Sequence, residues 1–178
     1  MNLSRTLAHR RSFLTLSGAI ALLIALPGCG GSTEKREYTV PDSLCGTSVD
    51  AQALSAFLPS GKRLTAKATT TAQGSKCGVT VDGKLVVTTS QEWWNAMSVR
   101  EFARGMTLDD PDHDTDDGVY AYSGHQAFGK ADSCHSAKHK GQVLFTAIQA
   151  TGSDHRDADA MKRLITRYTQ ASTKTRCG

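Results

Sequence analysis

Val79-Thr80-Val81-Asp82-Gly83-Lys84-Leu85-Val86-Val87-Thr88 is the stretch of sequence that decides the fold. Two runs rich in β-branched residues flank the dipeptide Asp82-Gly83. This dipeptide favours the type I′ turn, whose twist matches that of two paired strands. The stretch therefore predicts an antiparallel β-hairpin at the centre of the chain.

Further strands are expected on both sides of the hairpin. They are the segments 64–71, 119–122, 128–134 and 142–150, of which the last has the longest apolar run. Each is rich in β-branched or aromatic residues and is followed by turn residues. We therefore expect runs of strands separated by helices.

Three helices are predicted. The first would be capped by Ser48 and stopped by Pro59-Ser60-Gly61, and the second would span residues 93–104. In the third, the apolar stripe recurs at helical spacing and begins at Met161, with acidic residues near the helix start. Residues 41–178 thus predict a single α+β domain, an antiparallel sheet packed on one face by helices.

The first 28 residues predict export. Three arginines precede a short apolar stretch, and Pro27-Gly28 follows it, which is the pattern of a signal peptide. The stretch is shorter than the ~20 apolar residues that span a membrane comfortably. Arg10-Arg11-Ser12-Phe13-Leu14 resembles the core of a twin-arginine signal, although His9 stands where Ser or Thr is usual. Both the twin-arginine route and the general route therefore stay open.

Cys29 follows Leu26-Pro27-Gly28, which resembles a lipobox with Pro27 as the one departure. The resemblance implies a diacylglycerol on the Cys29 thiol and cleavage before it. It predicts a lipid anchor on the extracytoplasmic face of the cell membrane, with residues 29–40 as a flexible tether. The alternative is ordinary cleavage after Gly28, with Cys29 as a spare thiol.

The charge balance argues against a nucleic-acid partner. The chain has 21 Lys and Arg against 17 Asp and Glu, a net charge of +4. Three of the arginines lie in the predicted signal peptide, so the mature chain is almost neutral. A run of basic residues with interleaved aromatics is missing as well. About 140 residues then remain for one domain, which we expect to be a monomer.

The cysteines predict two disulfides. Apart from Cys29 the chain has four, Cys45, Cys77, Cys134 and Cys177, and an even number in an exported domain is typical of a disulfide framework. Three pairings are possible. We expect Cys45–Cys77 and Cys134–Cys177, because each pair would bracket one compact helix-and-strand half. The wide spacings do not favour a zinc site or a redox-active dithiol.

An acidic loop at residues 109–117 is the sharpest candidate for a cation site. Asp112, Asp114 and Asp116 alternate as the carboxylates of calcium loops do, and such carboxylates can converge on a hard cation. The match is imperfect, since Gly118 comes one residue late and Ser123 stands where an EF-hand has its bidentate Glu. A solvated acidic loop is the preferred alternative. The other members of the cluster are Asp109, Asp110, His113 and Asp117.

A histidine pair and a tryptophan pair each have two interpretations, one as a functional site and one as part of the structure. His135 and His139 could share a metal on one helix face, but this stretch looks like a turn between strands, and neighbouring lysines would repel a cation. Trp93 and Trp94 could form a sugar-stacking or membrane-interface platform. Adjacent side chains point in different directions, so we expect at most one of them to be exposed and favour core packing.

The mature chain resembles small actinobacterial-type secreted lipoproteins of uncharacterised function. The resemblance implies a sandwich-like α+β fold of the Mog1/PsbP kind and brings no catalytic residues with it. Its motifs are Cys29, Leu44-Cys45-Gly46, Leu58-Pro59-Ser60-Gly61, Cys77 beside the Val-x-Val-Asp-Gly hairpin, and a last helix that runs into Cys177-Gly178.

These observations favour a non-enzymatic, membrane-anchored binding or accessory module of the cell envelope. Its partner would be an envelope protein or a small ligand, with no cofactor. A ligand- or cation-binding lipoprotein that uses the loop 109–117 is the alternative, and a cell-wall hydrolase is a third. The hydrolase has little support, because the chain has no Gly-x-Ser-x-Gly, His-Glu-x-x-His or phosphate-loop motif. Its one Ser-x-x-Lys, Ser32 to Lys35, lies in the expected tether.

Overall fold

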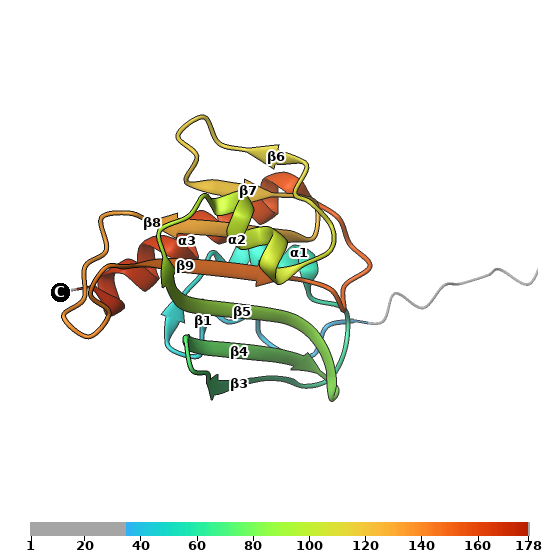
Figure 1. Ribbon diagram of the computed structural model, residues 1–178. Helices are drawn as coiled ribbons and strands as arrows, with labels where there is room; N and C mark the ends of the chain where they lie inside the picture. Colours follow the sequence, from blue (N-terminus) through green and yellow to red (C-terminus); the bar gives the residue numbers. More distant parts are fainter. Residues whose placement is uncertain (1–34, 178) are drawn as a thin grey trace, which may run out of the picture. The chain divides into compact units, whose positions relative to one another are not determined.

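Seven antiparallel strands form one sheet in the order β3-β4-β5-β9-β8-β7-β6 (Figure 1). The computed structural model describes residues 35–177, so the predicted signal peptide and Cys29 lie outside the described residues. The strands are β3 (Leu64–Thr70), β4 (Gly74–Val81), β5 (Lys84–Asn95), β6 (His113–Asp114), β7 (Tyr120–Tyr122), β8 (Gln126–Ala131) and β9 (Gln142–Gln149). A separate small hairpin pairs β1 (Ser43–Leu44) with β2 (Thr47–Ser48).

The predicted hairpin is confirmed as β4–β5. Its turn residues Asp82 and Gly83 both have positive φ, 48° and 83°, as a type I′ turn requires. The strands predicted at 64–71 and 142–150 are confirmed as β3 and β9, and those at 119–122 and 128–134 as β7 and β8 with shifted ends.

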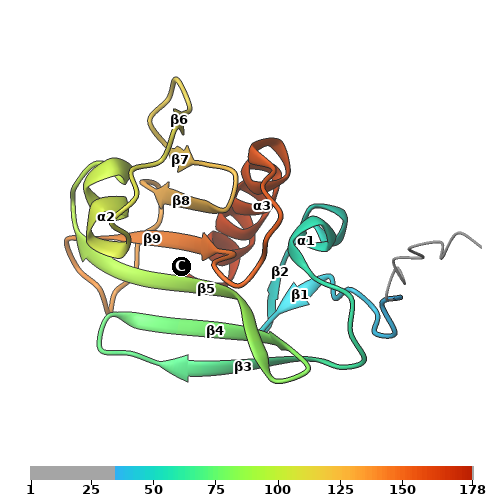
Figure 2. The ribbon, with the colours of Figure 1, turned by 90° about the vertical axis from the view of Figure 1, so that its right-hand side faces the viewer.

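Helices cover both faces of the sheet, which corrects the expectation of one covered face. Helix α1 (Ala51–Phe57) and helix α3 (Ala158–Arg176) lie with the small hairpin on one side, and helix α2 (Val99–Met106) lies on the other (Figure 2). The larger core packs α1 and α3 against the sheet around Phe57, Ile148 and Leu164. A smaller core packs Phe102 of α2 against Phe128 and Phe145.

The helix predicted at 93–104 is wrong in its first half. Strand β5 continues through Trp93 and Trp94, because these residues pair with Leu144 and Val143 of β9. The helix begins only after Ser98, which forms a capping box with Glu101.

The predicted cap of the first helix is also wrong. Ser48 belongs to β2, and the carboxylate of Asp50 caps α1 by accepting a hydrogen bond from Ala53 N at 2.9 Å. At the last helix the same role falls to Asp157, which accepts from Ala160 N at 2.8 Å. Both caps satisfy backbone N–H groups that the first helical turn leaves unpaired.

Both expected disulfides are present. Cys45–Cys77 ties the β1–β2 hairpin to β4, and Cys134–Cys177 ties the β8–β9 loop to the end of α3. Together they give the α+β domain with two disulfides that the sequence predicts. Within residues 35–177, no helix is both long enough and apolar enough to cross a membrane.

The tether predicted to reach residue 40 is docked from Arg36 onward. The guanidinium of Arg36 donates to the carbonyl oxygens of Ser55, at 2.9 Å, and Leu58, at the end of α1. The backbone N–H of Glu37 donates to Gly61 O at 2.8 Å. A cation suits the unpaired carbonyls at a helix C-terminus, which explains why a charged residue anchors this segment.

Candidate functional site

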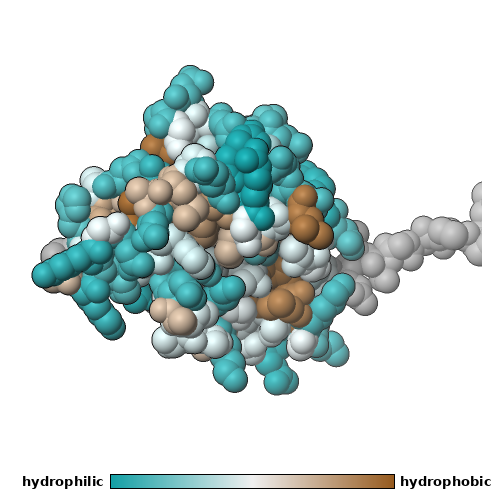
Figure 3. Space-filling view, in the orientation of Figure 1, coloured by the Kyte–Doolittle hydropathy of each residue, from teal (hydrophilic) through white to brown (hydrophobic). Residues whose placement is uncertain are grey.

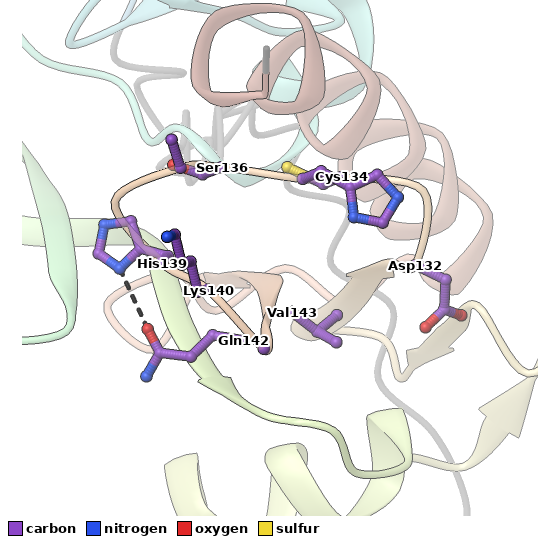
Figure 4. A pocket seen from close by; sticks show the side chains of 10 residues that line it. Asp132, Cys134, Ser136, His139, Lys140, Gln142 and Val143 are labelled. Carbon is purple, nitrogen blue, oxygen red and sulfur yellow. Dashed lines mark hydrogen bonds between the residues drawn. The ribbon is translucent and has the colours of Figure 1, made fainter.

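The β8–β9 loop surrounds a hollow of about 540 Å³, lined by ten of the residues from Asp132 to Val143 (Figure 4). His139 stacks on Trp93, with the ring centroids 4.5 Å apart, and its Nδ1 lies 3.1 Å from Gln142 Oε1. The side chains of Asp132 and His139 lie on opposite sides of the hollow. Polar groups therefore surround this hollow without converging in it, and His139 has a structural role.

The acidic loop does not gather its carboxylates. Asp114 pairs with Arg100, with 2.6 Å between Oδ2 and the guanidinium, and Asp110 pairs with Arg104 at 3.2 Å. Asp112 and Asp116 are exposed. Among residues 35–177, no three or more His, Cys, Asp or Glu side chains are grouped so that they could hold a metal ion.

Asp117 has hydrogen-bond donors from its own loop. Its Oδ1 accepts from Thr115 Oγ1 and, at 3.0 Å, from Val119 N. These hydrogen bonds lower the pKa of the Asp117 carboxyl because they favour its charged form. The hydrogen bonds to Asp117 thus hold one end of the acidic segment in a turn. Two ion pairs, to Arg100 and Arg104, attach the rest of the segment to α2.

Ser123 and His125 form a serine–histidine contact between β7 and β8. Ser123 Oγ lies 3.4 Å from His125 Nδ1, but the Ser123 residue is only 3% exposed. His155, in turn, packs its ring against Phe57 in an edge-on contact.

The tryptophan pair has separate roles. Trp93 is buried beside the Cys134–Cys177 disulfide. Trp94 is half-buried at the α2 side, and its indole N–H donates to Glu92 Oε2 at 3.0 Å. The two side chains therefore do not form a shared platform. On the face that Figure 3 shows, hydrophobic residues form small patches within a largely hydrophilic surface.

A polar network centred on Gln91 lies between the sheet and α3. The buried Gln91 amide donates to Thr47 Oγ1 at 2.7 Å and to Ser172 Oγ at 2.9 Å. Its Oε1 accepts from Arg176 Nε at 2.7 Å. Arg176 also donates to Ser75 Oγ at 2.8 Å. The network joins β2, β4, β5 and α3.

Thr47, Ser75, Gln91 and Arg176 of this network line a cavity of about 200 Å³ beside the Cys45–Cys77 disulfide, which we call the polar pocket. The phenol of Tyr168 also lines it. Burial raises the pKa of the Tyr168 phenol, so the group stays neutral and can donate its proton in a hydrogen bond. The lining thus combines side-chain hydroxyls with two cationic residues, Arg176 and Lys76, and the Lys76 ammonium lies 3.6 Å from Glu92 Oε1. Such a site suits a small ligand with acceptor oxygens, for example a carboxylate.

Sequence reasoning missed this site, although two signals point to it. Tyr168, Ser172 and Arg176 recur every four residues, which places them on one face of a helix. The strand β5 also carries a polar run, Thr89-Ser90-Gln91-Glu92, although all four residues are buried. Buried polar residues require partners, so such a run in a central strand indicates a polar network.

Comparison of the chain with protein families, with curated proteins and with solved structures found no match.

Proposed function

We propose that this chain is an exported lipoprotein, held through Cys29 at the extracytoplasmic face of the cell membrane, whose domain is a non-enzymatic binding or accessory module. The cysteine pairing carries the proposal. Four of the five cysteines are joined in two disulfides, so Cys29 alone remains for another role. It follows Leu26-Pro27-Gly28 directly, where a lipid-bearing cysteine is expected. Structural disulfides also suit an oxidising compartment outside the cytoplasm.

The polar pocket supports the binding role. It offers the Tyr168 phenol, the Arg176 guanidinium and side-chain hydroxyls in a cavity large enough for a small molecule. A hydrolase is less well supported, because Ser123, which contacts His125, is only 3% exposed. We therefore propose that the module binds a small ligand with acceptor oxygens at this pocket, or presents an accessory surface to an envelope protein.

Metabolic labelling with an alkyne-bearing fatty acid tests the anchor. The wild-type protein should carry the label and sediment with membranes. The variant Cys29→Ser should carry no label and leave the membrane fraction, whereas Ser32→Ala, a nearby change in the expected tether, should behave as wild type. An unlabelled wild-type protein would show that the proposed anchor is wrong.

Thermal unfolding in the presence of acetate, succinate and inorganic phosphate tests the pocket. An anion that binds there should raise the melting temperature of the wild-type protein by mass action. The rise should disappear in Tyr168→Phe, which removes only the hydroxyl, and persist in Tyr122→Phe on β7. The same rise in all three proteins would place the anion elsewhere, and no rise with any anion would contradict this ligand class.

A further inference from the structure

The chain enters the domain next to the tip of the β4–β5 hairpin. Arg36 forms a parallel bridge with Gly61, and the Asp82 carboxylate accepts hydrogen bonds from the backbone N–H groups of Lys62 and Arg63, both at 2.9 Å. Asp82 N donates in return to Arg63 O at 2.9 Å. Three distant segments are thereby fixed side by side. We call residues 35–37, 61–63 and 82–85 the entry face.

The entry face carries an excess of positive charge. Its two acidic residues are Glu37 and Asp82, and the Asp82 carboxylate already accepts two backbone hydrogen bonds. Asp154 adds a third carboxylate in the adjoining cavity, which Lys84 also lines. The five cationic residues of the face are Lys35, Arg36, Lys62, Arg63 and Lys84.

An exposed apolar residue follows one of these cations in the chain. Leu85 follows Lys84 at the start of β5 and is 49% exposed, one of two large hydrophobic residues that are exposed among those the structure describes. Cationic residues with an exposed apolar residue at the same hairpin tip are a combination that binds the interface of an anionic bilayer.

The length of chain before Arg36 determines which face is near the membrane. Six residues separate Cys29 from Arg36, so these two residues can be no more than about 24 Å apart at full extension. A domain of about 140 residues has a radius of gyration of about 14 Å, so its diameter exceeds the reach of the tether. The side of the domain opposite the entry face therefore cannot lie against the lipid.

We infer that the entry face rests on the membrane and binds anionic lipid headgroups, an inference that depends on the proposed lipid anchor at Cys29. Lys62, Arg63 and Lys84 contact the headgroups, and Leu85 lies at the acyl boundary. The opposite end of the sheet, with the β8–β9 loop and the end of α3, faces away from the bilayer (Figure 1). The contact is electrostatic, so salt weakens it over a Debye length of about 8–10 Å.

Lysine footprinting of the lipidated mature protein tests this orientation. The protein is placed on neutral vesicles, on vesicles with anionic lipid, and in detergent, and is treated with a membrane-impermeant amine reagent. Mass spectrometry then follows Lys62 and Lys84, with Lys140 and Lys174 at the opposite end as controls within the same molecule. We expect several-fold slower modification of Lys62 and Lys84 on anionic vesicles only, reversed by high salt. Lys140 and Lys174 should react equally in all three.

A charge-reversal pair separates the contact from the anchor. Lys35 belongs to the same face and should be protected on anionic vesicles together with Lys62 and Lys84. Lys62→Glu with Lys84→Glu should abolish this protection of Lys35, whereas Lys140→Glu with Lys174→Glu should preserve it. A protein that fails to float with any vesicle shows that the anchor is wrong, and the inference falls with it. A protein that floats but shows equal reactivity at both ends overturns the orientation alone. Equal protection of Lys62 and Lys84 on neutral vesicles overturns the role of anionic headgroups. Protection of Lys140 in place of Lys62 and Lys84 shows that the opposite surface contacts the membrane.

Discussion

Asp82 performs two tasks in the β4–β5 turn. It adopts the left-handed backbone conformation that the β4–β5 turn requires, with φ 48°, and its carboxylate fixes the turn to the segment before β3. Hydrogen bonds from the Lys62 and Arg63 backbones lower the pKa of this carboxyl. Asp82 therefore links the local geometry of the hairpin to the position of a distant strand.

The substitution Asp82→Asn tests this link through its pH dependence. A lowered folded-state pKa means that the carboxylate contributes stability above the unfolded pKa of about 4, and that this contribution is lost as the pH falls through the folded value. Wild-type stability should therefore decrease below about pH 4, and the Asn variant should show a shallower decrease. Urea unfolding between pH 6 and pH 3 measures this. The exposed control Asp116→Asn should keep the wild-type slope, and identical slopes in all three proteins would contradict the assignment.

Single residues also show what the sequence could predict of the candidate site. The alternating carboxylates Asp112, Asp114 and Asp116 resemble cation ligands, although a solvated loop is the preferred interpretation, because sequence spacing reveals alternation but not partners. In the folded chain Asp114 lies beside Arg100, fourteen residues earlier. The polar pocket was not predicted, since Gln91 and Ser172 are 81 residues apart and only the tertiary fold brings them together.

At the scale of elements, strand β5 shows how tertiary pairing overrides a local pattern. The segment 93–104 predicts a helix, yet Trp93 to Asn95 extend β5 because β9 offers them a full set of partners. The Ser98 and Glu101 capping box, a local signal, marks the true start of α2. Strong local signals, such as Asp82-Gly83, were therefore reliable, whereas a weak periodicity beside a central strand was not.

The disulfide at the end of α3 should contribute measurably to stability. Cys134 and Cys177 are 43 residues apart, and closing a loop of this length restricts the unfolded chain by about 4 kcal/mol in the loop-entropy model. Cys134→Ser with Cys177→Ser should lower the free energy of unfolding by about 2–4 kcal/mol. Urea unfolding followed by tryptophan fluorescence measures this, because Trp93 packs beside both cysteines. An unchanged midpoint, with the wild-type disulfide verified by mass spectrometry, would contradict it.

Strand β3 is an edge strand whose residues after Leu64 are exposed on both faces. Such an edge is open to pairing with another chain, and a charge at its centre opposes this. In an antiparallel pair centred on Lys67, two like charges would lie opposite each other. Lys67→Val should therefore increase self-association, measured by size-exclusion chromatography and light scattering, while Lys140→Val in a loop should not. A monomeric Lys67→Val variant at high concentration would show that the charge is unnecessary.

At the scale of the whole molecule, the fold class was predictable and the layering was not. Strand and helix order indicated α+β correctly, but nothing local in residues 99–106 shows which face of the sheet they cover. Phe102 packs against Phe128 and Phe145. The register between β8 and β9 is what places these two phenylalanines on the same face of the sheet. Face assignment therefore depends on long-range pairing.

The whole domain should also be indifferent to calcium. The carboxylates of residues 109–117 are exposed or engaged with Arg100, Arg104 and Thr115, so no folded-state site gains from the ion. Its melting temperature should be the same in millimolar calcium and in EDTA. Magnesium at equal ionic strength controls for screening, and a rise specific to calcium would restore the calcium-loop hypothesis.

The position of β9 in the sheet has a consequence for the order of folding. This strand lies between β5 and β8 although it is the last of the seven in the chain, so the two halves of the sheet have no partner until residues 142–149 exist. At about 5–20 residues per second, synthesis of the intervening segment 96–141 takes roughly 2–9 s. Throughout that interval the nascent chain presents β5 as an open, Val- and Trp-containing edge. We therefore expect the growing polypeptide to depend on a holding chaperone, a need that disappears once the central strand is inserted.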